Sequence, residues 1–120
     1  MEKGNLFHEI PDGPLPSERF DPLFSTDRLL IERIISTGHS TPEGEWYGQD
    51  NDEWVILLEG EARLRFSDDT VVTLQRGDYL FIPAHCRHRV EQTRETPPCI
   101  WLAVHGRIAG DVSHSQQVKK

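Results

Sequence analysis

The residues best suited to chemistry are a carboxylate and an imidazole, each held at a fixed spacing from a glycine or a proline. Glu53 opens the segment EWVILLE, and six residues separate it from Gly60. Five residues separate Gly77 from Pro83, and His88 lies five positions further on. Carboxylate and imidazole groups are ligands of divalent metal ions, and a buried carboxylate needs a partner. From residue type alone, Glu53 could equally be a solvated strand end.

The basic corner PAHCRHR, residues 83–89, has three interpretations: a metal site, an anion site or an exposed turn. We expect the turn at residues 84–87 to be exposed and His88, the first residue of the returning strand, to point inward. Strand alternation then points Arg89 outward. Arginines on an outer sheet face usually pair with neighbours such as Glu91 and contribute little to stability. The anion site is therefore not the expected interpretation.

Short strands must position these side chains. Residues 61–66 alternate cleanly, with Ala62, Leu64 and Phe66 on one face and charged residues on the other. Turn signals such as SDDT and QRGD separate further apolar segments, and no segment carries a helical stripe. The spacing predicts an antiparallel all-β barrel or sandwich. Strands are expected at residues 28–36, 53–59, 61–66, 71–74, 79–82, 88–92 and 99–105.

Three regions divide the chain: an arm at residues 1–27, a barrel at residues 28–105 and a polar tail at residues 106–120. Half of the eight prolines fall in the first 22 residues, which excludes a regular helix or an interior strand there. The arm nevertheless contains seven large apolar residues. We expect it to lie on the barrel or on a partner subunit, the second arrangement giving a homodimer.

Composition narrows the classes of partner. The chain has 120 residues, enough for one domain with one core, and a formal net charge of −7. A negative field repels the phosphate backbone, so nucleic acid is not an expected partner. Its apolar segments are too short to span a membrane, and no signal peptide follows the first residues. A cytoplasmic protein with two free thiols, Cys86 and Cys99, is expected.

The spacing of these residues resembles the two motifs of the cupin superfamily, G(X)5HXH(X)3–4E(X)6G and G(X)5PXG(X)2H(X)3N. The segments DEWVILLEGEARL, GDYLFIPAHCRHRV and IWLAVH carry the resemblance, which covers residues 28–105. It points to a small single-domain cupin group, much of it without an assigned activity. The resemblance implies a jelly-roll β-barrel in which Glu53 and His88 ligate a divalent metal such as Zn, Fe, Mn or Ni.

The sequence departs from this pattern at the other metal ligands. The two histidines of the first motif are replaced, by Trp46 and Gly48 or by Tyr47 and Gln49 according to the spacing chosen. Because a catalytic metal normally takes at least three protein ligands, a third donor would have to be found. Gln49 and Tyr47 are weak donors, and His39 and His85 are further candidates. The expected ligand-binding residues are Trp46, Tyr47, Gln49, Glu53 and His88.

The sequence leaves three hypotheses open. The first is a barrel that binds a small polar molecule, with or without a metal. The second is a metal-dependent isomerase or oxygenase acting on a small molecule. The third is a filled barrel that acts through its surface. Fold alone does not select among them, because one fold supports many chemistries.

Overall fold

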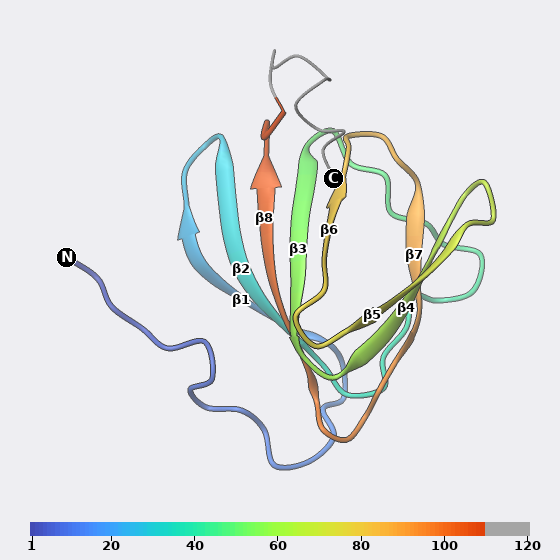
Figure 1. The fold of residues 1–120 in the computed structure, drawn as a ribbon. Helices are drawn as coiled ribbons and strands as arrows, with labels where there is room; N and C mark the ends of the chain where they lie inside the picture. The colour runs from blue at the N-terminus through green and yellow to red at the C-terminus, as the bar shows by residue number, and fades with distance from the viewer. Residues whose placement is uncertain (110–120) are drawn as a thin grey trace.

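A computed structural model describes residues 1–109, which form eight β-strands and no helix (Figure 1). The strands are β1 (Arg19–Ser25), β2 (Leu29–Ser36), β3 (Asp52–Glu59), β4 (Glu61–Phe66), β5 (Val71–Gln75), β6 (Tyr79–Ile82), β7 (His88–Thr93) and β8 (Cys99–Gly106). The strands expected from the sequence are all present, with ends that differ by at most one residue.

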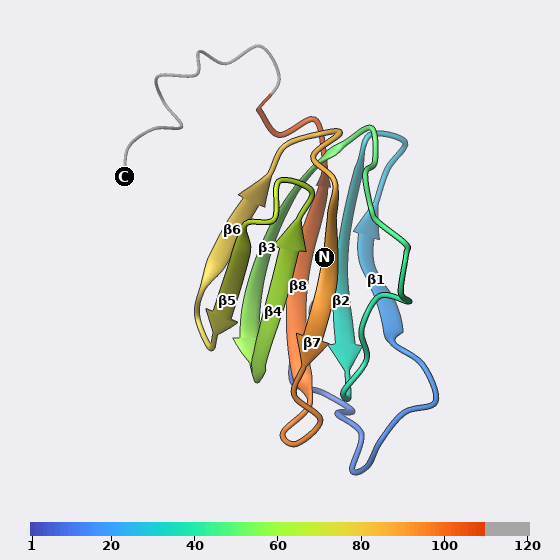
Figure 2. The same cartoon turned by 90° about the vertical axis from the view of Figure 1, so that its right-hand side faces the viewer.

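The strands form two antiparallel sheets that face each other. One sheet has the order β1-β2-β8-β3-β6 and the other has the order β5-β4-β7. Figure 2 shows the smaller sheet in front of the larger one, with the interior of the barrel between them. The predicted all-β jelly-roll barrel is therefore confirmed.

Period-two alternation explains why these segments are strands. In β4, Ala62 and Leu64 are buried whereas Arg63 between them is exposed. The core lies between the two sheets and combines inward-facing residues of both. Its fully buried residues include Leu57 of β3 and Cys99 of β8. Both cysteines are free thiols, as expected.

A proline lies within β1, which falls in the segment expected to be an arm. Among the described strands β1 pairs only with β2, so it is an edge strand, and its register shifts between Pro22 and Phe24. Edge strands and bulges are the places where a sheet accepts proline, because no ladder hydrogen bond is lost there. The first 18 residues, dark blue in Figure 1, run outside the sheets before entering β1.

The arm is attached to its own chain by a buried arginine. Arg33 of β2 donates from Nη1 to the carbonyl oxygens of Leu6, at 2.9 Å, and His8, at 2.7 Å. Further along, the amide of Leu15 donates to Thr37 Oγ1. These contacts cover the outer face of β2, where Arg33 is only 8% exposed.

Within residues 1–109 we find no helix with the length and apolarity needed to cross a membrane. β8 ends at Gly106, the first residue of the segment expected to be a polar tail. The rest of that tail, including His114, lies largely outside the described residues.

Candidate functional site

A cavity of about 250 Å³ opens inside the barrel, beside the buried core. Its lining comes from both sheets, from the loop before β3 and from Glu18, the residue that precedes β1. Most of the lining is apolar, and the polar groups are concentrated on a few carboxylate, imidazole, phenol and amide side chains. The lining residues are Glu18, Phe20, Glu32, Ile34, Tyr47, Gln49, Glu53, Val55, Leu64, Ile82, His88, Val90, Trp101 and His105.

Glu53 and His88 face each other across the interior, one from each sheet. Strand pairing aligns Glu53 with His105 of β8 and with Ile82 of β6, and all three side chains line the cavity. His88 opens β7 in the opposite sheet. The distance from His88 Nε2 to Glu53 Oε1 is 3.7 Å. The two side chains are 7% and 13% exposed, so both are withdrawn from bulk water.

A backbone contact fixes the orientation of the His88 ring. Nδ1 lies 2.9 Å from the carbonyl oxygen of Cys86, an acceptor, so in the neutral ring Nδ1 carries the proton. The lone pair of Nε2 then faces the cavity and Glu53. The turn before His88 supplies this contact, which links the position of the imidazole to the shape of residues 83–87.

A second carboxylate and imidazole lie next to the first pair. His105 Nε2 is 2.8 Å from Glu32 Oε2, and His105 Nδ1 is 3.3 Å from Gln49 Nε2. In the neutral ring, Nε2 donates to the carboxylate and Nδ1 accepts from the amide. The cavity therefore contains two pairs of a carboxylate and an imidazole. Both kinds of side chain can take up and release a proton.

Burial perturbs the ionisation of Glu53. Loss of water around this carboxyl raises its pKa, since burial disfavours the charged form. His105 and His88 oppose the rise, Glu32 adds to it, and Gln49 opposes it. The net result is a pKa above the ordinary value for a glutamate. Burial also raises the pKa of Tyr47, with the nearby carboxylate of Glu18 adding to the rise.

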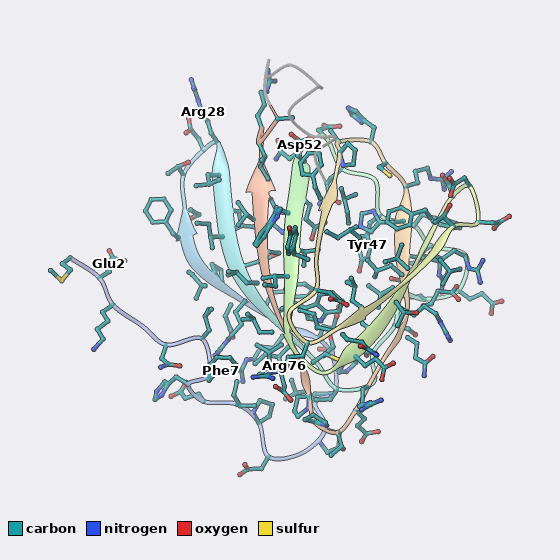
Figure 3. All side chains as sticks on the ribbon, in the orientation of Figure 1. Glu2, Phe7, Arg28, Tyr47, Asp52 and Arg76 are labelled. Carbon is teal, nitrogen blue, oxygen red and sulfur yellow. The ribbon has the colours of Figure 1, made fainter. Side chains whose placement is uncertain are left out.

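Four of the five residues expected from the sequence to bind a ligand line the cavity. They are Tyr47, Gln49, Glu53 and His88. Tyr47 reaches this position because a single β-bridge joins it to His88, and Figure 3 shows it on the side of the barrel where β7 lies. Trp46 is not part of the lining and instead packs against the Arg87 guanidinium, 5.6 Å from the ring centre.

The other histidines considered as third ligands lie elsewhere. His85 is exposed in the turn, as expected, with its side chain 71% accessible. His39 accepts a hydrogen bond from the amide of Thr37 at Nδ1, and its Nε2 lies 3.1 Å from the carbonyl oxygen of Leu15. Both ring nitrogens of His39 are therefore engaged, Nδ1 by Thr37 and Nε2 by Leu15 of the arm.

Sequence reasoning missed Glu32 and left the direction of His105 ambiguous. For His105 a signal existed, because it shares the period-two phase of buried Trp101 and Ala103. For Glu32, the alternation of buried and exposed residues that marks a strand face is absent. The neighbouring Arg33 is as buried as Glu32, because the arm covers the outer face of β2.

The arginines of the basic corner point away from the cavity. Arg89 donates from Nη2 to the carbonyl oxygen of Thr41 and lies 3.6 Å from Glu91, the expected partner. No arginine or lysine of residues 1–109 lines the cavity. Within residues 84–87, His85 and Arg87 are exposed as expected, whereas Ala84 and Cys86 are half-buried and Cys86 packs against the core.

The donor set does not fit a resident divalent ion of the kind that the resemblance implies. Within the described part of the chain, no three His, Cys, Asp or Glu side chains are grouped so that they could hold a metal. Glu53 and His88 converge, but the positions of the two missing histidines carry Tyr47 and Gln49. His105 is committed to Glu32. Two protein ligands are fewer than a catalytic metal normally takes.

Comparison with known proteins agrees with this architecture. The family model described as Cupin domain matches residues 34–105. A protein from Ralstonia eutropha JMP134, provisionally named a mannose-6-phosphate isomerase, is 44% identical with a TM-score of 0.84. That match covers 88% of this chain and 98% of the other. No curated protein matches the chain.

More distant solved structures share the fold alone. A cupin superfamily protein from Desulfitobacterium hafniense DCB-2 is 21% identical with a TM-score of 0.71, over 88% of this chain and 92% of that chain. The iron(II) form of HppE is 18% identical with a TM-score of 0.63, over 74% of this chain and 50% of that chain.

Proposed function

Because this chain belongs to the cupin superfamily, we propose that its barrel binds a small polar molecule in the cavity between Glu53, His88, Glu32 and His105. The observation that carries the proposal is the cavity itself, about 250 Å³ in volume and lined by these four side chains. Mostly apolar walls with a few convergent polar groups are typical of sites that bind small molecules.

The polar groups of the lining are suited to direct contact with such a molecule. Glu53 and His88 lie too far apart for a hydrogen bond with each other, so both have bonding capacity left for a ligand. Gln49 braces His105, which in turn holds Glu32. A ligand would therefore meet positioned side chains rather than mobile ones, which lowers the entropy cost of binding.

Thermal unfolding in the presence of a library of small polar molecules tests the proposal. A true ligand raises the melting temperature by mass action. The same compound should lose most of its effect on Glu53→Gln and retain it on Glu59→Gln. Glu59 lies at the far end of the same strand, where it pairs with Arg76 at the surface. A ligand that stabilises the two variants equally would place binding outside the cavity.

The alternative is a metal-dependent isomerase or oxygenase. Two observations favour it. Glu53 and His88 converge. In addition, His88 Nδ1 contacts a backbone carbonyl oxygen, which is how proteins orient a metal-binding imidazole. The provisional name of the 44% identical relative belongs to the isomerase class. Gln49 or Tyr47 would have to serve as a third ligand, since His105 is held by Glu32.

Elemental analysis separates the two candidates. A metal-dependent enzyme purified without chelator contains Fe, Mn, Zn or Ni in a stoichiometric amount, and its melting temperature rises when that ion is added. We expect neither result. A stoichiometric metal that is lost in His88→Ala would favour the alternative instead.

A further inference from the structure

We infer that the molecule bound in this cavity carries a positively charged amino group, and that a phosphorylated ligand is rejected. The inference rests on the proposed function, because it names the chemical class of the ligand for the same cavity. It draws on the charges of the lining, on the balance of hydrogen-bond donors and acceptors, and on the aromatic walls.

The charged lining is acidic throughout. Three carboxylates, Glu18, Glu32 and Glu53, border the cavity, and no arginine or lysine of residues 1–109 does. Glu32 and Glu53 are 12% and 13% exposed at their side chains, so their charges are only weakly screened by water. A cation entering this space is attracted by several carboxylates, whereas a phosphate is repelled by the same groups.

The space between Glu53 and His88 requires a hydrogen-bond donor. His88 Nδ1–H donates a hydrogen bond to the carbonyl oxygen of Cys86, so Nε2 is an acceptor in the neutral ring. Glu53 Oε1 is also an acceptor and lies 3.7 Å from that nitrogen. A single donor group with two or more N–H bonds can bridge His88 Nε2 and Glu53 Oε1 at this separation. An ammonium group has three donors and no acceptor, so it suits this position.

Glu32 and Glu18 leave further acceptors available. His105 bonds to Oε2 of Glu32, and Ser36 Oγ donates to Oε2 of Glu18. Among the described residues, each of these carboxylates thus has a hydrogen-bond partner at one oxygen. The Gln49 amide contacts His105 and also hydrogen-bonds Glu53, so it is already engaged, whereas Glu32 and Glu18 keep acceptor oxygens for a ligand.

Aromatic side chains in the lining add to the attraction for a cation. Phe20, Tyr47 and Trp101 line the cavity, and aromatic faces attract ammonium groups through their quadrupoles. Trp101 is 5% exposed, and its Nε1 is fully buried, so that donor lies out of reach of a ligand in the cavity. The acidic lining and the aromatic side chains together indicate an organic amine.

Two matched sets of probes test the inference by thermal shift and calorimetry. The first set is mannosamine, mannose and mannose 6-phosphate, which share a sugar ring and differ in charge. The second set is 3-amino-1-propanol, 1,3-propanediol and 3-hydroxypropanoate. We expect the amine to raise the melting temperature most in at least one set, and mannose 6-phosphate to have no effect. Equal or larger stabilisation by a neutral or anionic member, or no shift with either amine, would overturn the inference.

Variants connect the preference to the carboxylates. Glu53→Gln and Glu32→Gln should each weaken amine binding about tenfold, the loss expected for a charge-assisted hydrogen bond. Glu59→Gln on the same strand serves as the control and should bind the amine like the wild type. If mannose binds and Glu53→Gln abolishes that binding while the amine has no advantage, the proposed function stands and the charge preference fails.

Discussion

His88 Nε2 lies 3.7 Å from Glu53 Oε1, although the two residues belong to different sheets and are 35 positions apart in the chain. The gap exceeds the length of a hydrogen bond, so each atom keeps hydrogen-bonding capacity, although the two groups are close enough for His88 to oppose the rise in the pKa of Glu53. Both side chains face the interior, as the strand register required. The separation of Glu53 and His88 is the geometric basis of the ligand binding proposed for the cavity.

Replacing Glu53 by glutamine should stabilise the ligand-free protein at pH 8. Burial is the main cause that raises the pKa of Glu53, so the folded protein holds this proton more tightly than the unfolded chain. The contribution of Glu53 to stability is therefore fully present below the unfolded value, 4.5, and is lost as the pH rises through the higher folded value. Glutamine has no charge to bury and avoids that loss.

Urea unfolding at pH 5 and pH 8 measures the effect of Glu53→Gln. The free energy of unfolding of the variant should exceed that of the wild type at pH 8, and the excess should shrink at pH 5. Glu59→Gln, at a half-exposed position on the same strand, should show no such pH dependence. A glutamine variant that is less stable than the wild type at pH 8 would mean that the Glu53 charge is compensated.

Two glycines with similar backbone angles should respond differently to alanine. Gly60 has φ +101° and Gly77 has φ +92°, so each substitution stores strain of about 1–3 kcal/mol. A Cβ on Gly60 would also lie 2.5 Å from Sγ and 2.8 Å from Cα of Cys99, whereas Gly77 has open space around it. Chemical denaturation should therefore show a larger loss for Gly60→Ala, by about a further 1–3 kcal/mol from overpacking. Equal losses would show that the backbone angle alone decides.

Asp52 should be a structural carboxylate whose removal destabilises the end of the barrel near the site. Its Oδ1 accepts from the amide of Ala84 and its Oδ2 from the amide of Ala109, and Asp52 is 8% exposed. Figure 3 shows Asp52 at the upper end of β3. Asp52→Ala leaves these donors unpaired and should cost about 2 kcal/mol or more in the free energy of unfolding.

The pH dependence of Asp52→Ala has the opposite sign to that of Glu53→Gln. Hydrogen bonds from backbone amides, Ala109 first, hold the pKa of Asp52 below its ordinary value. Its contribution is present above the unfolded value, 3.8, and is lost as the pH falls through the lower folded value. The gap between wild type and variant should thus narrow in strong acid. Asp50→Ala, with its side chain 98% exposed, should leave stability unchanged at every pH.

Most of the barrel could be predicted from the sequence, because its turns are marked and its strands alternate. β4 and β6 were predicted to the residue, since glycine or turn sequences delimit both. β1 was not expected, because Pro22 is incompatible with an interior strand and only tertiary pairing shows that the segment forms an edge.

The candidate site could be predicted only in part, for a physical reason. The spacing to glycine and proline pointed to Glu53 and His88, because those turns fix the ends of β3 and the start of β7. Glu32 remained hidden because both faces of β2 are covered, one by the barrel interior and one by the arm. Pairing between distant strands, which brings Glu32 beside His105, is not encoded in local periodicity.

Replacing Arg33 by methionine should release the arm while leaving the barrel folded. Arg33 donates to the carbonyl oxygens of Leu6 and His8 and, from Nη2, to Asp21 Oδ2 at 2.7 Å. Methionine retains the buried stem but none of these donors, so chymotrypsin should cleave beside Leu6 and Phe7 about tenfold faster. Arg28→Met, at an exposed arginine that only begins the turn into β2, should be cleaved at the wild-type rate. If both variants are cleaved alike while the barrel's melting temperature stays unchanged, other contacts attach the arm and Arg33 serves only to neutralise Asp21.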